Sequence, residues 1–266
     1  MRHALGIAYL GTQYFGWQSQ PDQPTVQAFV EKALSFVADE PIRVYCSGRT
    51  DRGVHATNQV IHFDSNAQRS TNNWLRGVNA ALPDDIQVVW HRVVDETFHA
   101  RHCALSRQYT YLLYVRPTPN VIWSNHALMI PNALDIKAMR QGAKVLVGEH
   151  DFSSFRAAHC QAKSPCKTLY SIEIDQYHHW MTFSFHANAF LYHMIRIMMH
   201  AILEIGYQKK EIQWLESVLK AKNRSLATAM VPPNGLYFQG AQYHKDYDIP
   251  QFKDILGGDL RCFLNQ

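Results

Sequence analysis

Apolar residues recur with two different periods along the chain, and this mixture predicts both helices and strands. From residue 25 to 38 they recur every three or four positions, which is typical of one face of a helix, and Thr25 can cap its start. From 107 to 115 the residues alternate with period two, which is typical of a strand. The same patterns predict helices at 71–81, 134–147, 190–205 and 210–221, and strands at 3–10, 42–46, 59–64, 86–94, 169–175, 180–187 and within 232–240.

The order of these elements is similar in two successive stretches of the chain. A similar order of helices and strands returns after Pro117 and Pro119. Within the second stretch, the strands at 169–175 and 180–187 pair naturally across the polar turn QYHH. We therefore predict an α+β fold of two related halves, residues 1–105 and 106–266, rather than a doubly wound parallel sheet.

Composition indicates a soluble globular protein without a membrane span. Of 266 residues, 47% are hydrophobic and 18% are charged, which is ordinary for a folded domain. The most apolar stretch, FLYHMIRIMMHAILEIG, is interrupted by polar and charged residues before it reaches the length that a bilayer requires. The N-terminal residues lack the pattern of a secretory signal. We expect a cytoplasmic protein that does not bind membranes.

No motif in the sequence indicates a metal or a cofactor. The five cysteines form no C-x-x-C pair, no H-E-x-x-H pattern is present, and neither glycine-rich nucleotide fingerprint occurs. We therefore expect no disulfide framework, no metal site and no cofactor. The cysteines are Cys46, Cys103, Cys160, Cys166 and Cys262.

Net charge permits a polyanionic partner without requiring one. The formal charge is +4, and the basic residues are spread along the chain in small groups. This distribution favours a basic surface assembled by the fold over a basic tail.

The loop SGRTDRGVHA, residues 47–56, concentrates unusual chemistry between two predicted strands. Arg49, Asp51 and Arg52 lie close together on a loop that glycines allow to bend. From these residues alone, a polar hairpin in which Asp51 caps a turn is the simpler interpretation.

Three further segments combine polar or aromatic groups in ways that allow two interpretations. YLGTQYFGWQSQ, residues 9–20, could stack on bases and bind their edges, or it could be a bent loop that buries Tyr14 and Trp17. GEHDFSSFR, residues 148–156, reads as a helix exit followed by an Asx-type turn. Arg196 lies in a helix that is apolar almost all round, so a buried guanidinium there needs a partner. The alternative is an arginine at the rim of the helix or one paired with a structural Glu.

Six motifs in the same order resemble one enzyme family. SGRTDRGVHA resembles the signature G-R-T-D-x-G-V-H-A/G of the TruA family of tRNA pseudouridine synthases. YLGTQYFGWQSQ resembles that family's N-terminal block, and FHARHCALSRQYTYLLY resembles its F-H-A-R segment followed by R-x-Y-x-Y. GEHDFSSFR, ANAFLYHMIR and PPNGLYF match its later blocks. The resemblance covers residues 4 to about 240 at matching spacing, which makes chance a poor explanation.

The resemblance implies a reaction and a partner. Members of this family convert uridine to pseudouridine at positions 38, 39 and 40 in the anticodon stem-loop of tRNAs, without a cofactor. The implied enzyme is a homodimer that binds tRNA. Its two halves would share a central antiparallel sheet flanked by helices, with the catalytic cleft between them.

The resemblance also assigns roles to individual residues. Asp51 becomes the catalytic aspartate and nucleophile, although the sequence leaves open a route in which it acts as a base. Arg49 would help to displace the target nucleotide, or it could simply neutralise Asp51. Arg196 would pair with Asp51 and keep it ionised. Tyr109 would stack on the extruded uracil, and His55 would take part in substrate binding.

The sequence leaves the roles of some residues undetermined and allows two alternative functions. A packing role for the tyrosine at 109 would suit Tyr111 equally well. Arg52, His200 and Pro233 stand where the family commonly has Ala, Gly and Ala, which leaves fine specificity and helix packing undetermined. A similar enzyme that acts on another RNA is one alternative, and an RNA-binding protein that has lost catalysis is another.

Overall fold

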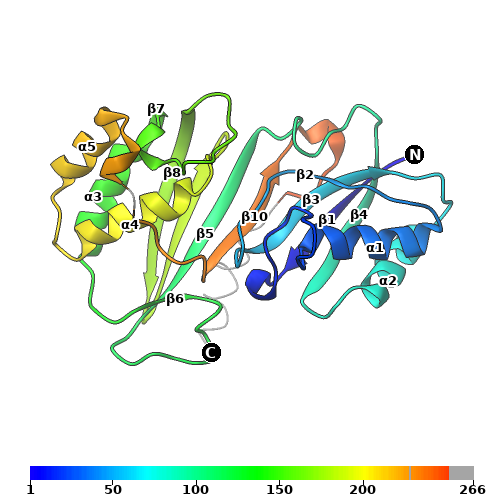
Figure 1. Ribbon diagram of the computed structural model, residues 1–266, viewed down its shortest axis with the longest axis horizontal. Helices are drawn as coiled ribbons and strands as arrows, with labels where there is room; N and C mark the ends of the chain where they lie inside the picture. Colours follow the sequence, from blue (N-terminus) through cyan, green and yellow to red (C-terminus); the bar gives the residue numbers. More distant parts are fainter. Residues whose placement is uncertain (228, 252–266) are drawn as a thin grey trace. The chain divides into compact units, whose positions relative to one another are not determined.

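The computed structural model describes residues 1–227 and 229–251, and these residues form two compact units (Figure 1). Unit 1 comprises Met1–Arg107 and the described residues from Tyr237 onward, and unit 2 comprises Gln108–Leu236. Residues 252–266, which include Cys262 and the end of the predicted C-terminal half, lie outside the described residues, as does Thr228. The first unit is therefore discontinuous in the sequence.

Unit 1 contains a sheet with the strand order β4, β1, β3, β10. β1 (Arg2–Tyr9) pairs antiparallel with β3 (His55–Asp64) and with β4 (Ile86–Val94), and the short β2 (Tyr45–Cys46) pairs with β3. β10 (Leu236–Gln242) runs parallel to β3. The register places Tyr9 opposite Ala56 and Tyr237 opposite His55, so both neighbouring strands support the start of β3.

Two helices complete unit 1. α1 (Val26–Ala38) and α2 (Thr71–Ala81) contact one another, and α2 also contacts β4 (Figure 1). Phe29 of α1 is 37% exposed and meets Tyr14 edge-on. Burial of a Val or Leu side chain contributes about 1.5–3 kcal/mol, so the buried set anchors both helices. The buried apolar side chains are Val26, Val30, Ala33, Leu34, Ala38, Trp74 and Val78.

Unit 2 contains a second group of paired strands, in the order β5, β9, β8, β7. β8 and β9 form an antiparallel hairpin in which Tyr177 lies opposite Trp180, which confirms the predicted pairing across QYHH. β7 pairs antiparallel with β8, and β6 pairs parallel with β5. The strands are β5 (Ser106–Val115), β6 (Leu128–Ile130), β7 (Gly148–Asp151), β8 (Cys166–Tyr177) and β9 (Trp180–Ala187).

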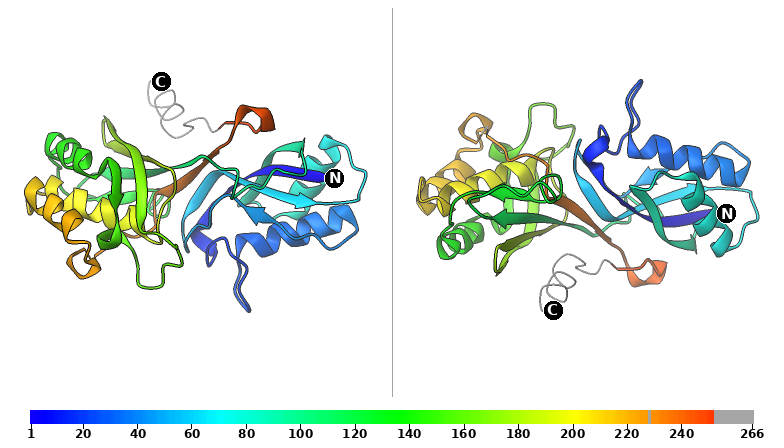
Figure 2. Two further views of the ribbon diagram at one scale, coloured as in Figure 1. Left: turned by 90° about the horizontal axis from the view of Figure 1, so that it is seen from above. Right: turned by 90° about the horizontal axis from the view of Figure 1, so that it is seen from below.

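Three helices lie together in unit 2, as Figure 2 shows. α3 (Ile136–Leu146) contacts α4 (Met194–Gly206), α5 (Ile212–Ala221) and β8. Short 3-10 turns complete the description of both units: η1 (Gly11–Gln13), η2 (Ser153–Phe155), η3 (Arg224–Leu226) and η4 (Lys245–Tyr247).

The start of α4 differs from the sequence prediction. The apolar pattern placed it at residue 190, but the helix begins at Met194 because His193 has a left-handed backbone, with φ of 61°. From there to Gly206 almost every side chain is buried, as the all-round apolar pattern indicated.

The strand pairs and helices confirm the predicted fold class. Most of the described strand pairs are antiparallel, β3–β10 and β5–β6 are parallel, and helices flank the strands of both units. The fold is therefore α+β. Within the described ranges, no helix has both the length and the hydrophobicity needed to span a bilayer.

Candidate active site

The loop that carries Arg49 and Asp51 joins β2 to β3 in unit 1, and residues near the N-terminus hold it. The backbone N–H of Trp17 donates to the carbonyl of Thr50 at 3.1 Å, and the Tyr9 hydroxyl lies 2.7 Å from Thr50 Oγ1. The backbone N–H of Val54 donates to the carbonyl of Asp51 at 3.1 Å and closes the turn. Asp51 therefore lies in a short segment that is fixed on both sides.

Two glycines allow the N-terminal segment to approach this loop closely. Gly16 has φ of +88°, and a Cβ at that position would lie 2.7 Å from the Thr50 carbonyl oxygen. A Cβ at Gly11 would lie 2.0 Å from the carbonyl oxygen of Val54. Neither distance is compatible with a side chain, so glycine at both positions is a requirement of the packing.

Arg52 also contacts the N-terminal segment. Its guanidinium carbon lies 4.0 Å from the centre of the Phe15 ring, which is a cation–π geometry. The residue is exposed, so the contact adds a modest stabilisation at the surface. Arg52 therefore has a structural contact of its own with the N-terminal segment.

A buried glutamine holds the base of the loop. The Gln59 side-chain oxygen accepts from Ser47 Oγ at 2.7 Å, and its amide donates to the Gly48 carbonyl at 2.5 Å. Arg107 donates from Nη2 to the carbonyls of Ser47 at 3.3 Å and Arg101 at 2.7 Å. These contacts link the loop to the F-H-A-R block and to Arg107, the first residue of the R-x-Y-x-Y block.

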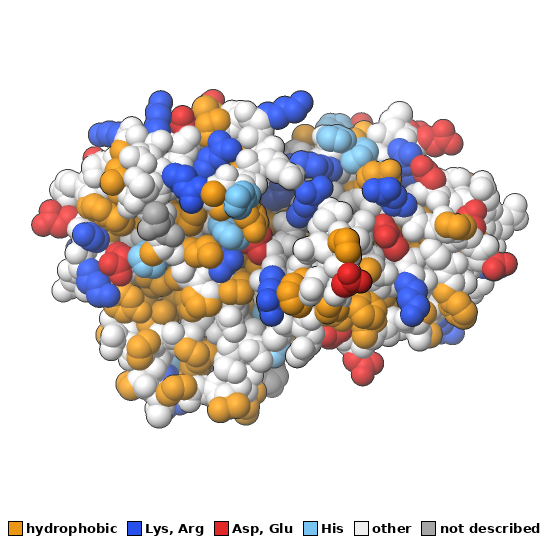
Figure 3. Space-filling view, in the orientation of Figure 1, with side chains coloured by type: hydrophobic (Ala, Val, Ile, Leu, Met, Phe, Trp, Pro, Cys, Tyr) orange, Lys and Arg blue, Asp and Glu red, His pale blue; other side chains and the backbone are white. Residues whose placement is uncertain are grey.

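Two arginines place positive charge near the base of the loop. Burial raises the pKa of the Cys46 thiol to about 11, and the cations Arg49 and Arg101 oppose that rise. Because a nearby cation favours an anion, this part of unit 1 suits a polyanionic ligand. Figure 3 shows Lys and Arg side chains spread over the visible face of both units rather than confined to one segment.

His55 lies at the start of β3 and is completely buried, with 0% exposure. Its Nδ1 accepts the backbone N–H of Gly11 at 3.0 Å, and its ring stacks on Tyr237 with 4.7 Å between centroids. Accepting at Nδ1 requires that this nitrogen carry no proton. The geometry therefore gives His55 a part in positioning the loop, and its predicted contact with substrate stays a prediction.

The aromatic residues of the N-terminal segment are part of the core. Tyr14 and Trp17 are 4% and 1% exposed. The Tyr14 hydroxyl donates to Asp85 Oδ1 at 2.5 Å, and the Trp17 ring packs beside Tyr9. Of the two interpretations of this segment, the bent loop that buries its aromatic rings is confirmed.

In unit 2, the structure distinguishes the two tyrosines of the Y-T-Y strand. Tyr111 is completely buried, and its hydroxyl donates to the Pro232 carbonyl at 2.7 Å, which is a structural contact. Tyr109 lies on the same face of β5, is 9% exposed, and meets the ring of Phe190 edge-on at 5.3 Å. Tyr111 therefore has a structural partner for its hydroxyl, and the predicted stacking of Tyr109 on uracil stays a prediction.

Arg196 in α4 is only 9% exposed and binds the backbone of a neighbouring segment. Its Nε donates to the Val231 carbonyl at 2.9 Å, and the Val231 N–H donates back to the Arg196 carbonyl at 3.2 Å. The backbone N–H of Leu112 donates to Gly235 O at 2.8 Å. The PPNGLYF block and the residue before it therefore hold both Arg196 and the β5 strand in place.

The GEHDFSSFR block has the predicted local geometry. Asp151 Oδ1 accepts the backbone N–H of Ser153 at 2.9 Å, which confirms the Asx-type turn. Hydrogen bonding from Ser153 is the main cause of the lowered pKa of Asp151, and the Lys222 cation adds to it. Arg156 in the same block donates to the Cys160 carbonyl.

The predicted site residues are divided between the two units. Arg49, Asp51 and His55 belong to unit 1, and Tyr109 and Arg196 belong to unit 2. Sequence reasoning did not assign the supporting residues Tyr9, Gln59, Arg107 and Val231, although Tyr9 and Arg107 lie inside the quoted motifs. Over residues 1–227 and 229–251, no group of three or more His, Cys, Asp or Glu side chains could hold a metal ion.

Comparison with known proteins identifies the family. A family model described as tRNA pseudouridine synthase matches residues 6–102 and 143–244. A protein of Polaromonas naphthalenivorans named tRNA pseudouridine synthase A is 49% identical over 255 residues, which cover 94% of this chain and 96% of the relative. Relatives of the same name from Methylibium petroleiphilum and Shewanella pealeana are 48% and 45% identical over 251 residues, with the same coverage.

Among solved structures, the chain is similar to one described as a Cbf5–Nop10–Gar1 complex, with a TM-score of 0.37 and 14% identity over 76% of this chain and 45% of that one. This weak similarity supports no conclusion about function. The family is instead shown by the extent of the family match and by the sequence identity to relatives that this chain covers almost completely. The chain belongs to the tRNA pseudouridine synthase family. It is an isomerase that acts on uridine in tRNA.

Proposed function

We propose that this enzyme converts uridine to pseudouridine at positions 38, 39 and 40 in the anticodon stem-loop of tRNAs, and that it does so in the cytoplasm without a cofactor. Family membership supports the reaction and the tRNA substrate. The motif resemblance supports the positions in the anticodon stem-loop. The observation that carries the proposal is the single acidic residue, Asp51, in a loop that two separate segments hold in place.

The reaction needs a carboxylate and a site that holds the detached uracil firmly. Uridine loses the bond between ribose C1′ and uracil N1, the detached uracil turns, and C1′ bonds to C5. C5 then loses its hydrogen as a proton and N1 takes up a proton, so the product is an isomer of the substrate. The redox state does not change. Asp51 acts as the nucleophile that keeps the intermediate on the enzyme while the uracil turns. Because the reacting atoms lie within a stacked stem-loop, the nucleotide must first be extruded.

The other predicted residues serve extrusion and orientation. Arg49, which is exposed two residues before Asp51, displaces the target nucleotide and takes its place. Tyr109 stacks on the extruded uracil, which contributes on the order of 1–3 kcal/mol. Arg196 keeps the Asp51 carboxylate ionised and oriented, since guanidinium groups bind carboxylates in two-pronged geometry. His55 supports substrate binding through the loop that it helps to hold.

The test is Asp51→Asn, measured by tritium release from tRNA labelled at uracil C5. We expect the rate to fall by at least about 10²–10⁴-fold, the range of an essential proton-transfer or nucleophilic group, while thermal stability and tRNA affinity stay close to wild type. Asp39→Asn is the matched control, because Asp39 is exposed at the end of α1 with φ of 57°, a conformation that asparagine also accepts. Near-normal turnover by Asp51→Asn would refute the assignment.

The positions and the rival functions are tested together by mass spectrometry of bulk tRNA from a strain that lacks the gene. Loss of pseudouridine at positions 38–40, restored by wild type but not by Asp51→Asn, is the expected result. Loss of pseudouridine in another RNA would favour a different substrate. Unchanged RNA modification would favour an RNA-binding protein without catalysis.

We also propose that the enzyme is a homodimer. Val121 and Ile122 are adjacent and are 87% and 76% exposed, and hydrophobic side chains gather in the lower part of unit 2 in Figure 3. Exposed apolar residues that lie together favour a protein contact. We expect light scattering to give the mass of a dimer and Val121→Asp to shift the equilibrium toward monomer. A wild-type monomer at micromolar concentration would contradict the proposal.

A further inference from the structure

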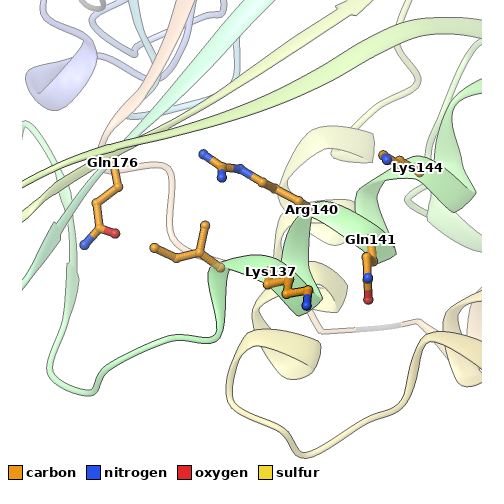
Figure 4. A pocket seen from close by; sticks show the side chains of 6 residues that line it. Lys137, Arg140, Gln141, Lys144 and Gln176 are labelled. Carbon is orange, nitrogen blue, oxygen red and sulfur yellow. The ribbon is translucent and has the colours of Figure 1, made fainter.

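A cavity in unit 2 is lined by none of the residues to which the proposed reaction assigns a role. Its volume is about 610 Å³, and it is formed by α3 and by Gln176 of β8 (Figure 4). Its lining residues are Ile136, Lys137, Arg140, Gln141, Lys144 and Gln176. We call this cavity the α3 groove.

The basic residues of the groove lie along one face of α3. Lys137, Arg140, Gln141 and Lys144 have the spacing i, i+3, i+4 and i+7, which places them on the same side of a helix. All four are exposed. The opposite side of the helix is apolar and buried. The buried residues are Met139, Gly142, Ala143 and Leu146.

Arg140 is held in one orientation at the centre of this row. Its Nε and Nη2 both donate to the Ile174 carbonyl, at 3.0 and 2.7 Å. Figure 4 shows the side chain reaching from α3 toward the strand that carries Gln176. Since a guanidinium has five N–H groups, the two bonds to Ile174 leave three for a ligand. A pre-oriented guanidinium loses little entropy when it binds an anion.

The charge of the groove defines the class of ligand. Its lining holds three cations, two amides and no carboxylate. In the part of the chain that the structure describes, no carboxylate forms an ion pair with Lys137, Arg140 or Lys144. Lys137 and Lys144 are seven positions apart, which corresponds to a rise of about 10.5 Å along a helix. A row of cations of that length suits successive phosphates of one strand better than a single small anion.

We propose that the α3 groove binds the phosphate backbone of the tRNA substrate, at a place distinct from the residues that handle the uridine. This inference rests on the proposed function for the identity of the polyanion. Contacts to phosphates add affinity and position the RNA without reading its sequence. The groove therefore contributes to KM and not to kcat.

The test is the double substitution Lys137→Gln/Lys144→Gln, which removes two charges and keeps Arg140 on the Ile174 carbonyl. We expect the slope of log Kd against log salt for full-length tRNA to fall by about 2. At low salt, Kd and KM should rise about 2- to 30-fold, as expected for two surface ionic contacts, with kcat unchanged. The matched control is Lys32→Gln/Lys220→Gln, which removes the same charge from exposed positions on α1 and α5.

Three results would overturn the inference: an unchanged salt slope, an equal change in the control variant, or a fall in kcat with KM unchanged. An unchanged salt slope would instead favour an acidic protein surface as the ligand of the α3 groove. Filter binding measures affinity and salt slope without turnover, whereas tritium release by the wild-type enzyme on the same tRNA tests the proposed reaction. Failure of the groove and failure of the function are therefore distinguishable.

Discussion

Gly16→Ala is a direct test of how the N-terminal segment positions the loop that carries Asp51. The new Cβ would lie 2.7 Å from Thr50 O and 3.2 Å from both the Arg52 nitrogen and the Asp51 carbonyl carbon. All three atoms belong to the backbone of the loop, so no side chain can rotate away to make room. The loop must move by several tenths of an ångström, or the segment 14–18 must detach from it.

The expected size of the effect follows from two contributions. A residue other than glycine at φ of +88° costs about 1–2 kcal/mol, and an overpacked contact costs about 1–3 kcal/mol. The free energy of unfolding should therefore fall by about 2–5 kcal/mol. A shift of about 1 Å in a catalytic group can lower the rate about 10²-fold, so we expect kcat to fall about 10- to 100-fold while tRNA affinity changes little.

The assay combines urea unfolding with tritium release under saturating tRNA. Gly77→Ala is the matched control, because Gly77 lies inside α2 and the three atoms nearest its new Cβ would all belong to the Val37 side chain, the first at 3.1 Å. Alanine there gains up to about 1 kcal/mol of helix propensity, and kcat should stay at the wild-type value. A Gly16→Ala enzyme with wild-type kcat would refute the view that this contact positions Asp51, even if its stability fell.

Other substitutions test the remaining assignments. Tyr109→Phe should keep the single-turnover rate closer to wild type than Tyr109→Leu does, because stacking needs an aromatic face, and equal rates for the leucine variant and wild type would leave only a packing role. Arg196→Met should lower kcat more than tRNA affinity, and it should move the acid limb of the pH–rate profile to higher pH, because a carboxylate that loses a neighbouring cation is easier to protonate. Arg196→Lys should recover part of the activity. An unchanged acid limb in the methionine variant would contradict the pairing of Arg196 with Asp51. The Cys46 thiol, whose pKa burial raises to about 11, should react with iodoacetamide at pH 8 far more slowly than the exposed Cys166, so comparable rates would count against the raised pKa.

Local patterns in the sequence predicted the elements well where local forces decide the structure. The helix at 25–38 and the hairpin of β8 and β9 follow from apolar periodicity and a polar turn, and both are present. The start of α4 was wrong by four residues because Leu191 and Ile195 continue the apolar pattern through His193. Nothing in that pattern reveals the left-handed backbone at His193.

Contacts between distant parts of the chain could not be predicted from periodicity. The Y-T-Y alternation does not distinguish Tyr109 from Tyr111, because residues two apart share a face of the strand. The hydrogen bond of the Tyr111 hydroxyl to the Pro232 carbonyl comes from a distant segment and is not visible in that pattern. Gln59 lies in a strand whose sequence shows only simple alternation, yet its side-chain amide binds Ser47 and Gly48 at the base of the loop that carries Asp51. The roles of Asp51 and Arg196 came from motif resemblance. Reasoning from single residues favoured a turn for Asp51, and a rim position or a structural Glu partner for Arg196.

The return of β10 to unit 1 makes the order of synthesis relevant to the catalytic loop. Thr57 Oγ1 donates to the Gln239 side-chain oxygen across a separation of 182 residues, and Tyr237 stacks on His55 in the same place. A ribosome must therefore make nearly the whole chain before the last neighbour of β3 exists. Closing a loop of that length is slow relative to local hairpins, so we expect β3 to acquire its β10 partner late in folding. Nascent chains that end before residue 236 can form much of each unit, but they lack the tyrosine against which His55 stacks.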